Sequence, residues 1–223
     1  MVAEPYIIYV KQRLNDYPDQ RIQLGEKYTW GEIQRCLNAC LLHIVNICLQ
    51  KQAYSPLVGL YRTVIIDSSP YSISNIENLM WIRGAQVYHQ RRMAYETARW
   101  LGASGSAIPY LYSRINAVAL LAGELVFVDD EKNITGGILE YYVYPSTLTI
   151  QVQGAPDYLV KDLPDWMYWL AAELTVMTLG IRDGQGVRDA SAWQLWWEKL
   201  NGAIEEALAT RERSVIHAPE ALL

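Results

Sequence analysis

The chain has 223 residues, of which 51% are hydrophobic and 19% are charged, and this composition is that of a globular protein rather than a disordered one. The formal net charge of -5 excludes broad electrostatic binding to nucleic acid, because neutralising phosphates requires clustered Lys and Arg side chains. The sequence shows no secretory signal and no apolar run near the roughly 20 residues of a membrane span. We therefore expect a soluble protein made in a cytosol.

The first fifty residues predict two helices. A short amphipathic helix is expected between residues 3 and 16, and Pro18 limits its extension. Thr29, with Glu32 three residues later, has the spacing of a capping box, so a second helix should run from there to about Leu49. Its apolar residues recur at helical spacing and predict an inward stripe of Ile33, Leu37, Cys40 or Leu41, Ile44 and Cys48.

The middle of the chain, residues 54–156, predicts short strands with one helix among them. Strands are expected at 62–66, 79–88 and 125–128, and a pair of strands at 138–144 and 148–152 around Pro145. Residues 90–101 are predicted to be helical until Gly102 begins a loop. Asp129, Asp130 and Glu131 indicate an exposed turn. No linker or low-complexity tract marks a boundary, so the β-rich region should be an insertion between helical parts.

The last third again predicts helices. Pro164 fits the first position of one helix, and Gly180 is expected to end it. A second helix is predicted from about Asp189 to Arg211, followed by an extended tail at residues 214–223, which contain Pro219. The predicted buried stripes are Trp166, Trp169 or Leu170, Leu174 and Met177 in the first helix, and Trp193, Trp196 or Trp197, Leu200, Ile204 and Leu208 in the second.

Together these elements predict an α+β protein. We expect a single domain at residues 1–213, with helical parts at about 3–50 and 163–212 and a β-rich insertion at about 54–156. The chain contains 16 Tyr and 8 Trp but only 1 Phe. Tyr and Trp combine a large apolar ring with a polar atom, and this combination suits half-buried surfaces, including subunit interfaces.

One cluster has the residue types of a metal site. Cys36, Cys40 and His43 fall at i, i+4 and i+7 of the same predicted helix. Three ligands along one straight helix cannot wrap a tetrahedral ion without a fourth from elsewhere. Because their positions coincide with the apolar stripe, and free Cys behaves as a small buried hydrophobe, we interpret them as core residues. We expect no metal and no cofactor.

Catalytic residues are not expected either, so the chain is predicted not to be an enzyme. His89 and His217 lie apart from each other and from any obvious nucleophile, and no G-x-S-x-G pattern occurs. The main alternative is a hydrolase or transferase whose site brings together His89, Asp129 or Asp130, and Ser104 or Ser106. A second alternative is a small oligomeric regulatory binding module that dimerises through the Trp-rich helices.

Four stretches of the chain share a pattern of residue type and order with a known family. Three of them are TWGEIQRCLN at residues 29–38, YYVYP at 141–145, and QGAP at 153–156 leading into LPDW at 163–166. The fourth is the final helix, preceded by Asp189 and carrying Trp193 and Trp197. In these stretches, from about residue 29 to residue 208, the chain resembles the head-to-tail adaptor (connector) proteins of short-tailed double-stranded DNA phages.

The resemblance implies a mainly α-helical bundle with an inserted β-rich protrusion, copied twelve times into a ring. Such a ring lies in the neck of the virion, between the portal protein and the tail nozzle or tail tube, and is assembled in the host cytoplasm. DNA passes through its lumen without sequence-specific binding, and no membrane is involved. The resemblance also implies that the C-terminal tail docks on the portal, with Ser214, Val215, Ile216, Leu222 and Leu223 as its anchors.

Overall fold

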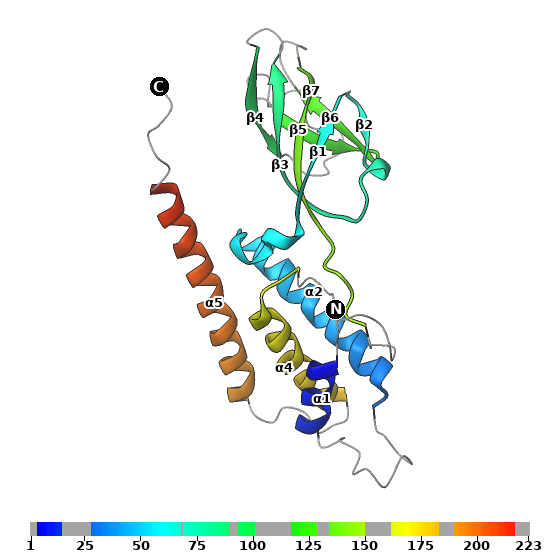
Figure 1. Cartoon of the computed structure of the whole chain (residues 1–223), viewed down its shortest axis with the longest axis vertical. Helices are drawn as coiled ribbons and strands as arrows, with labels where there is room; N and C mark the ends of the chain where they lie inside the picture. The colour runs from blue at the N-terminus through cyan, green and yellow to red at the C-terminus, as the bar shows by residue number, and fades with distance from the viewer. Residues whose placement is uncertain are drawn as a thin grey trace. The chain divides into compact units, whose positions relative to one another are not determined.

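A computed structural model describes residues 4–14, 28–67, 69–89, 93–100, 117–128, 134–149, 162–182 and 190–216 (Figure 1). These residues form an α+β protein, as the sequence predicts. The chain divides into two compact units, one formed by Met1–Gly59 and Pro145–Leu223 and the other by Leu60–Tyr144. We call them the helical unit and the sheet unit. Among the helices in the described ranges, none is long and apolar enough to cross a membrane.

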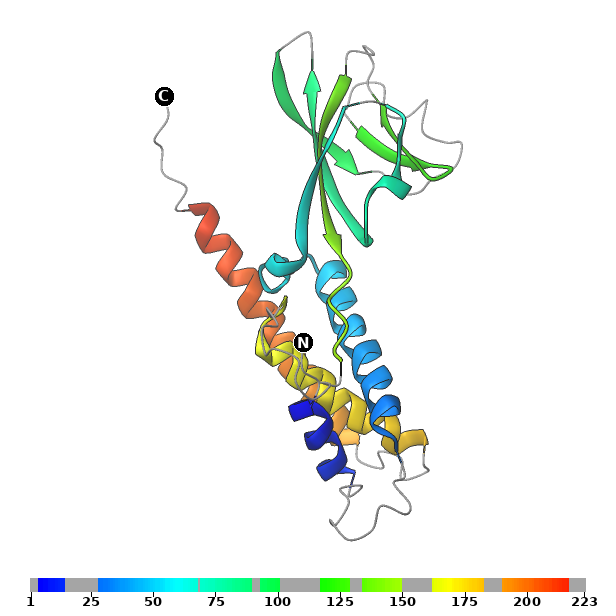
Figure 2. The same cartoon turned by 45° about the vertical axis from the view of Figure 1, so that its right-hand side comes forward.

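The described residues of the helical unit form four α-helices. They are α1 (Glu4–Arg13), α2 (Trp30–Gln50), α4 (Asp165–Arg182) and α5 (Ala190–Ile216). Helix α4 packs on the other three, and Figures 1 and 2 show it beside both α2 and α5. A short 3-10 helix, η1 (Ser55–Leu60), follows α2. The helical unit therefore combines segments from both ends of the chain around α4.

Helix α2 confirms the prediction from its capping box. The Thr29 side chain accepts a hydrogen bond from Glu32 N at 3.2 Å, and Glu32 Oε2 accepts one from Thr29 N at 3.0 Å. These bonds satisfy backbone groups that the first turn of a helix leaves without partners. The predicted inward stripe is buried throughout, and both Cys40 and Leu41 belong to it.

The helices predicted outside residues 54–156 also exist, with different ends. Helix α4 begins one residue after Pro164, whose carbonyl accepts from Met167 N at 3.0 Å, and it continues past Gly180 to Arg182. Helix α5 runs to Ile216 and therefore includes Ser214 and Val215. The prediction that the extended tail begins at residue 214 is wrong for these three residues, because the backbone continues its helical turns through them. Residues 217–223 lie outside the described part of the chain.

The described residues of the sheet unit form seven strands in the order β1-β7-β3-β4-β5-β6-β2. The strands are β1 (Tyr61–Ile66), β2 (Tyr71–Ser72), β3 (Leu79–His89), β4 (Ala94–Trp100), β5 (Ala117–Leu121), β6 (Glu124–Val128) and β7 (Ile134–Val143). Neighbours are antiparallel except β4 and β5, which run parallel. Side chains from one face form the core of this unit, among them Ile66, Ile82, Val87, Val118, Leu125 and Leu139.

A two-residue turn joins β5 to β6. Ala122 and Gly123 both have positive φ, at 50° and 85°. Two consecutive positive φ angles are typical of the turn whose twist matches an antiparallel hairpin. The register continues across this turn from Leu121 paired with Glu124 to Ala117 paired with Val128.

The predicted helix at residues 90–101 is wrong where the structure describes it. Ala94–Trp100 is strand β4, and it pairs with β3 so that Ala98 lies opposite Ala85 and Glu96 opposite Val87. Helix propensity is a weak preference of single residues, whereas pairing with β3 satisfies a whole row of backbone groups and buries Ala98. Tertiary pairing therefore overrides the local helical pattern.

The predicted strand at 148–152 is not formed at Leu148, which belongs to none of the strands of the described residues. Thr149 forms an isolated β-bridge, and the other three positions lie outside the described ranges. The chain leaves the sheet at Pro145, which cannot donate to a strand ladder. Leu148 binds α2 instead: its backbone N donates to Asn38 Oδ1 at 2.8 Å, and its carbonyl accepts from Asn38 Nδ2 at 3.1 Å and Gln34 Nε2 at 2.8 Å.

We expect Asn38→Ala to lower the free energy of unfolding by about 1–3 kcal/mol, because it removes the acceptor of the buried Leu148 N–H and one of the two donors to the Leu148 carbonyl. Asn38→Asp should also be destabilising, since it keeps the acceptor but faces the Leu148 carbonyl with a carboxylate. Chemical unfolding measures both effects. Asn46→Ala, at a half-buried position of the same helix, is the control. Equal stability of Asn38→Ala and the wild type would contradict the role of this side chain.

Candidate docking surface

Large apolar side chains lie exposed on the helical unit. Trp169 is 43% exposed, Ile181 50%, Leu195 54% and Trp197 39%. Single exposed apolar residues are ordinary, but two of these belong to α4 and two to α5, the helices that pack together. Large apolar side chains left exposed in this way are candidates for contact with another protein.

The orientation of α5 explains why Leu195 and Trp197 face outward. The indole of Trp196 is only 2% exposed, and its Nε1 donates to the Leu170 carbonyl of α4 at 2.9 Å. Lys199 Nζ adds an ion pair with Glu173 of α4 at 2.7 Å. These contacts fix the rotation of α5 about its axis, so residues on either side of Trp196 lie away from the core. Of the two predicted alternatives, Trp196 is the buried residue, and Trp197 only packs against its ring, with centroids 5.1 Å apart.

A second aromatic group joins α1 to α4. The Trp169 ring contacts Tyr6 and Tyr9 of α1 edge to face, at centroid distances of 4.9 and 5.5 Å. Leu170 is the buried member of the predicted pair Trp169 or Leu170, at 7% exposed. Edge-to-face aromatic pairs stabilise such contacts beyond the area that they bury. Trp169 therefore holds α1 in place with one edge while part of its ring stays open to solvent.

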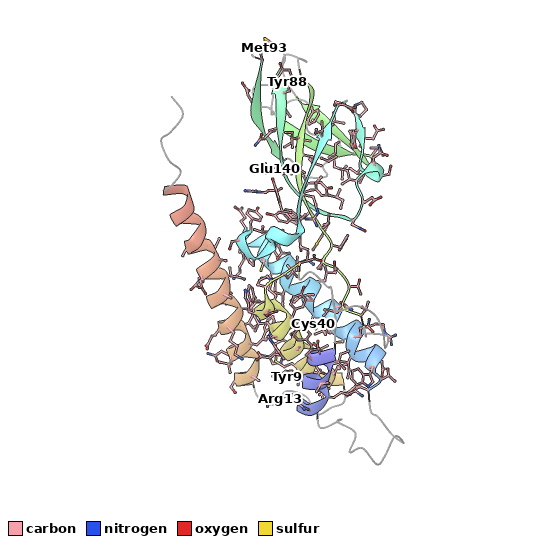
Figure 3. The ribbon with its side chains drawn as sticks, viewed as in Figure 1. Tyr9, Arg13, Cys40, Tyr88, Met93 and Glu140 are labelled. Atoms are coloured by element: carbon pink, nitrogen blue, oxygen red, sulfur yellow. The ribbon has the colours of Figure 1, made fainter. Side chains whose placement is uncertain are left out.

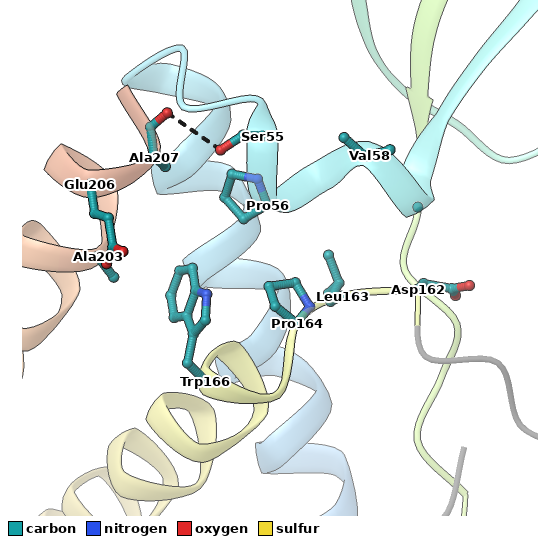
Figure 4. A pocket seen from close by; sticks show the side chains of 11 residues that line it. Ser55, Pro56, Val58, Asp162, Leu163, Pro164, Trp166, Ala203, Glu206 and Ala207 are labelled. Carbon is teal, nitrogen blue, oxygen red and sulfur yellow. Dashed lines mark hydrogen bonds between the residues drawn. The ribbon is translucent and has the colours of Figure 1, made fainter. Parts of the chain in front are cut away.

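An open groove of about 770 Å³ lies between η1, the start of α4 and α5 (Figure 4). Pro56, Trp166 and Ala203 line it, together with the acidic residues Asp162 and Glu206. Ser55 Oγ at its edge donates to the Ala207 carbonyl at 3.4 Å. No histidine, cysteine or lysine is among the described lining residues. The groove is therefore an apolar and acidic depression in the surface of the helical unit.

The Cys36, Cys40 and His43 cluster agrees with the core interpretation only in part. Cys40 is buried on α2 within the helical unit (Figure 3), Cys36 is half-buried, and His43 is exposed. The three side chains therefore do not share one environment. Within the described ranges, no group of three or more His, Cys, Asp or Glu side chains is placed to hold a metal ion.

The residues of the predicted alternative active site are largely outside the described ranges. His89 is the last residue of β3, and its side chain is not described. Asp129, Asp130, Ser104, Ser106 and His217 lie outside the described part of the chain. The described residues therefore neither support nor contradict this alternative active site.

The tail residues named as portal anchors divide into two sets. Ser214, Val215 and Ile216 are the last residues of α5, where only the backbone is described. Leu222 and Leu223 lie outside the described ranges. Sequence reasoning missed the exposed side chains of Ile181 and Leu195. The only sequence signal for their exposure was that neither residue falls on the predicted buried stripe of its helix.

Replacing Trp196 by Phe should lower the free energy of unfolding by about 1–3 kcal/mol, because it removes the hydrogen bond to Leu170 and leaves space in the core. Trp197→Phe is the matched control one residue away, and it should change stability by less than about 0.5 kcal/mol because Trp197 is partly exposed. Urea unfolding of both variants checks the difference. A larger loss for Trp197→Phe would show that the rotation of α5 is wrong.

Stability should also depend on pH through Cys48. Burial raises the pKa of this thiol from 9.0 to about 11, although the charge of Lys51 opposes the change. Between these two values the unfolded chain releases the Cys48 proton and the folded chain retains it, so stability falls as pH rises from about 9 to about 11. In Cys48→Ala this part of the decline disappears, and unfolding midpoints measured across that range should show a flatter profile. Parallel profiles for wild type and variant would refute the assignment.

No protein-family model matches this chain, and no curated protein matches it. The exposed apolar side chains of α4 and α5, and the groove beside η1, are the features on which a functional proposal rests.

Proposed function

We propose that this protein is a structural component of a virion, a head-to-tail adaptor of a short-tailed double-stranded DNA phage. Twelve copies form a ring between the portal protein and the tail nozzle or tail tube. DNA passes through the lumen of this ring and is not bound sequence-specifically. The helical unit acts as the bundle of the adaptor, and the sheet unit as its protrusion.

The observation that carries this proposal is the set of large apolar side chains that α4 and α5 leave exposed. Trp169, Ile181, Leu195 and Trp197 are each more than one-third exposed in the single chain. Leaving such groups in water is unfavourable, and covering them with a partner is stabilising by roughly 25 cal/mol per Å². Aromatic residues are also enriched at protein interfaces. A subunit that is buried between neighbours in an assembled ring accounts for side chains of this kind.

The residues of the family resemblance supply the second support. Asn38, in the first of the resembling stretches, binds the backbone of Leu148 just after the second stretch. Trp166, in the third, lines the groove, and Trp193 of the fourth stacks edge to face on Trp196 at 6.5 Å. Residues that are distant in the sequence thus take part in one helical unit. This favours a common structural reason for the pattern over coincidence of composition.

The charge of the chain agrees with the passage of DNA. A net charge of -5 gives phosphates little to bind, so a lumen lined by such subunits lets the duplex slide. Portal docking belongs to the C-terminal segment, residues 214–223. Because α5 continues to Ile216, the docking segment includes the end of a helix as well as residues 217–223.

Deleting residues 214–223 should leave a folded protein that no longer binds the portal ring of its phage, since the chain loses its proposed portal-docking segment. Co-sedimentation with portal rings measures binding, and circular dichroism verifies folding. A second deletion, of residues 217–223 alone, separates the contribution of the last helical turn. Electron microscopy of the wild-type mixture should show a coaxial ring on the portal. Full binding by the longer deletion, or the absence of any ring, counts against the proposal.

A further inference from the structure

We propose that the outer face of α5 docks on the outer face of α2 from a second copy of the chain. This inference deepens the proposed function and rests on it, because the second copy is the neighbour in the ring. The two faces are defined by exposed residues of the helical unit. Neither contributes to the core of its own copy.

The outer face of α5 is a continuous stripe opposite the buried one. Trp196, Leu200 and Ile204 point into the core. On the opposite side of α5, a series of residues that follow one another at intervals of three or four positions is exposed. The stripe contains one apolar side chain, two carboxylates and two small residues. In order these are Leu195, Glu198, Gly202, Glu205 and Ala209.

The outer face of α2 has the complementary character. Ile33, Leu37 and Ile44 point into the core, and the opposite stripe is exposed or half-buried. It contains a guanidinium, an imidazole, an amide, one apolar and one small side chain, and no carboxylate. Its members are Arg35, Ala39, Leu42, His43 and Asn46.

The spacings of the ionisable side chains on the two faces agree. Arg35 and His43 are eight positions apart and Glu198 and Glu205 seven, which at about 1.5 Å rise per residue is about 12 Å and about 10.5 Å along each helix. Ala39 lies between the two basic groups of α2, and Gly202 between the two carboxylates of α5. Small residues at these positions let two helix backbones approach closely. Arg35 therefore faces Glu198 while His43 faces Glu205.

The direction of the helices supports this pairing. Tyr28, just before α2, donates through its hydroxyl to Leu179 near the end of α4 at 3.0 Å, so α2 and α4 are antiparallel. Helix α5 is antiparallel to α4 as well, because Trp196 binds Leu170 while Ala203 lies in the groove with Trp166 at the start of α4. Hence α2 and α5 run in the same direction on opposite sides of α4 (Figure 1). A cyclic ring preserves this direction between neighbours.

Two different faces meeting in this way form a heterologous interface. Each copy offers one α5 face and one α2 face, so every contact leaves a free face at each end until the rotation closes. An assembly of this type gives a ring rather than a dimer. The groups that specify it are the charges at Arg35, Glu198 and Glu205, because complementary charges fix the register of an interface and repel incorrect partners.

Charge reversal tests the interface directly. Arg35→Glu and Glu198→Arg, each made in the full chain, should weaken self-association at least about tenfold, because each places like charges opposite one another. An equimolar mixture of the two variants should assemble again, in alternation, since every contact then joins opposite charges. The double variant should assemble with itself and not with the wild type. Sedimentation velocity and native mass spectrometry measure all four preparations.

Controls with the same change of charge are available on the sheet unit. Arg62→Glu and Glu77→Arg reverse exposed charges outside both faces and should leave self-association unchanged. Assembly of both single variants at the wild-type level, or failure of their mixture to recover, overturns the inference. So does a wild-type chain that stays monomeric in solution. In each of these cases a coaxial ring on portal particles would still support the proposed function, so the two failures are distinguishable.

Discussion

The contact between Asn38 and the backbone of Leu148 is the interaction on which the architecture depends. The helical unit consists of two segments, Met1–Gly59 and Pro145–Leu223, and the entire sheet unit separates them in the sequence. The Asn38 amide both donates to and accepts from Leu148, as a neighbouring strand would. A side chain on a helix thus replaces a strand ladder at the point where the chain returns. Because Leu148 is fully buried there, the segment that leads into α4 begins from a fixed position.

Helix α4 then determines the surface that the protein presents. It uses one side to bury the stripe of α2 and another to bind Trp196 and Lys199 of α5. The same contacts turn Leu195 and the carboxylates of α5 outward. Surface and core are thus two results of one constraint, the rotation of α5 about its own axis where it packs on α4. The functional proposals depend on that rotation and not on any single reactive group.

Sequence patterns predicted the helices well because their signals are local. The capping box of Thr29 and Glu32 and the periodic stripe of α2 need no information from elsewhere in the chain. The errors occurred where a distant partner decides. β4 is a strand because β3 pairs with it, and Leu148 leaves the sheet because Asn38 binds it. The choice of Trp196 over Trp197 likewise required the Leu170 carbonyl. The docking faces could not be predicted as faces, since their rotation is set by packing on α4.

The interrupted order of the helical unit has a consequence for synthesis. The hydrogen bond of Tyr28 needs the Leu179 carbonyl, which is 151 residues later in the sequence. That of Lys51 needs the Asn201 side chain, which is 150 residues later. Contacts of such long sequence separation form slowly. During translation the strands of Leu60–Tyr144 can fold together because they are close in the sequence. The apolar face of α2 stays exposed until the last third of the chain has left the ribosome. A nascent chain of this kind is a natural client for chaperones that shield apolar helices.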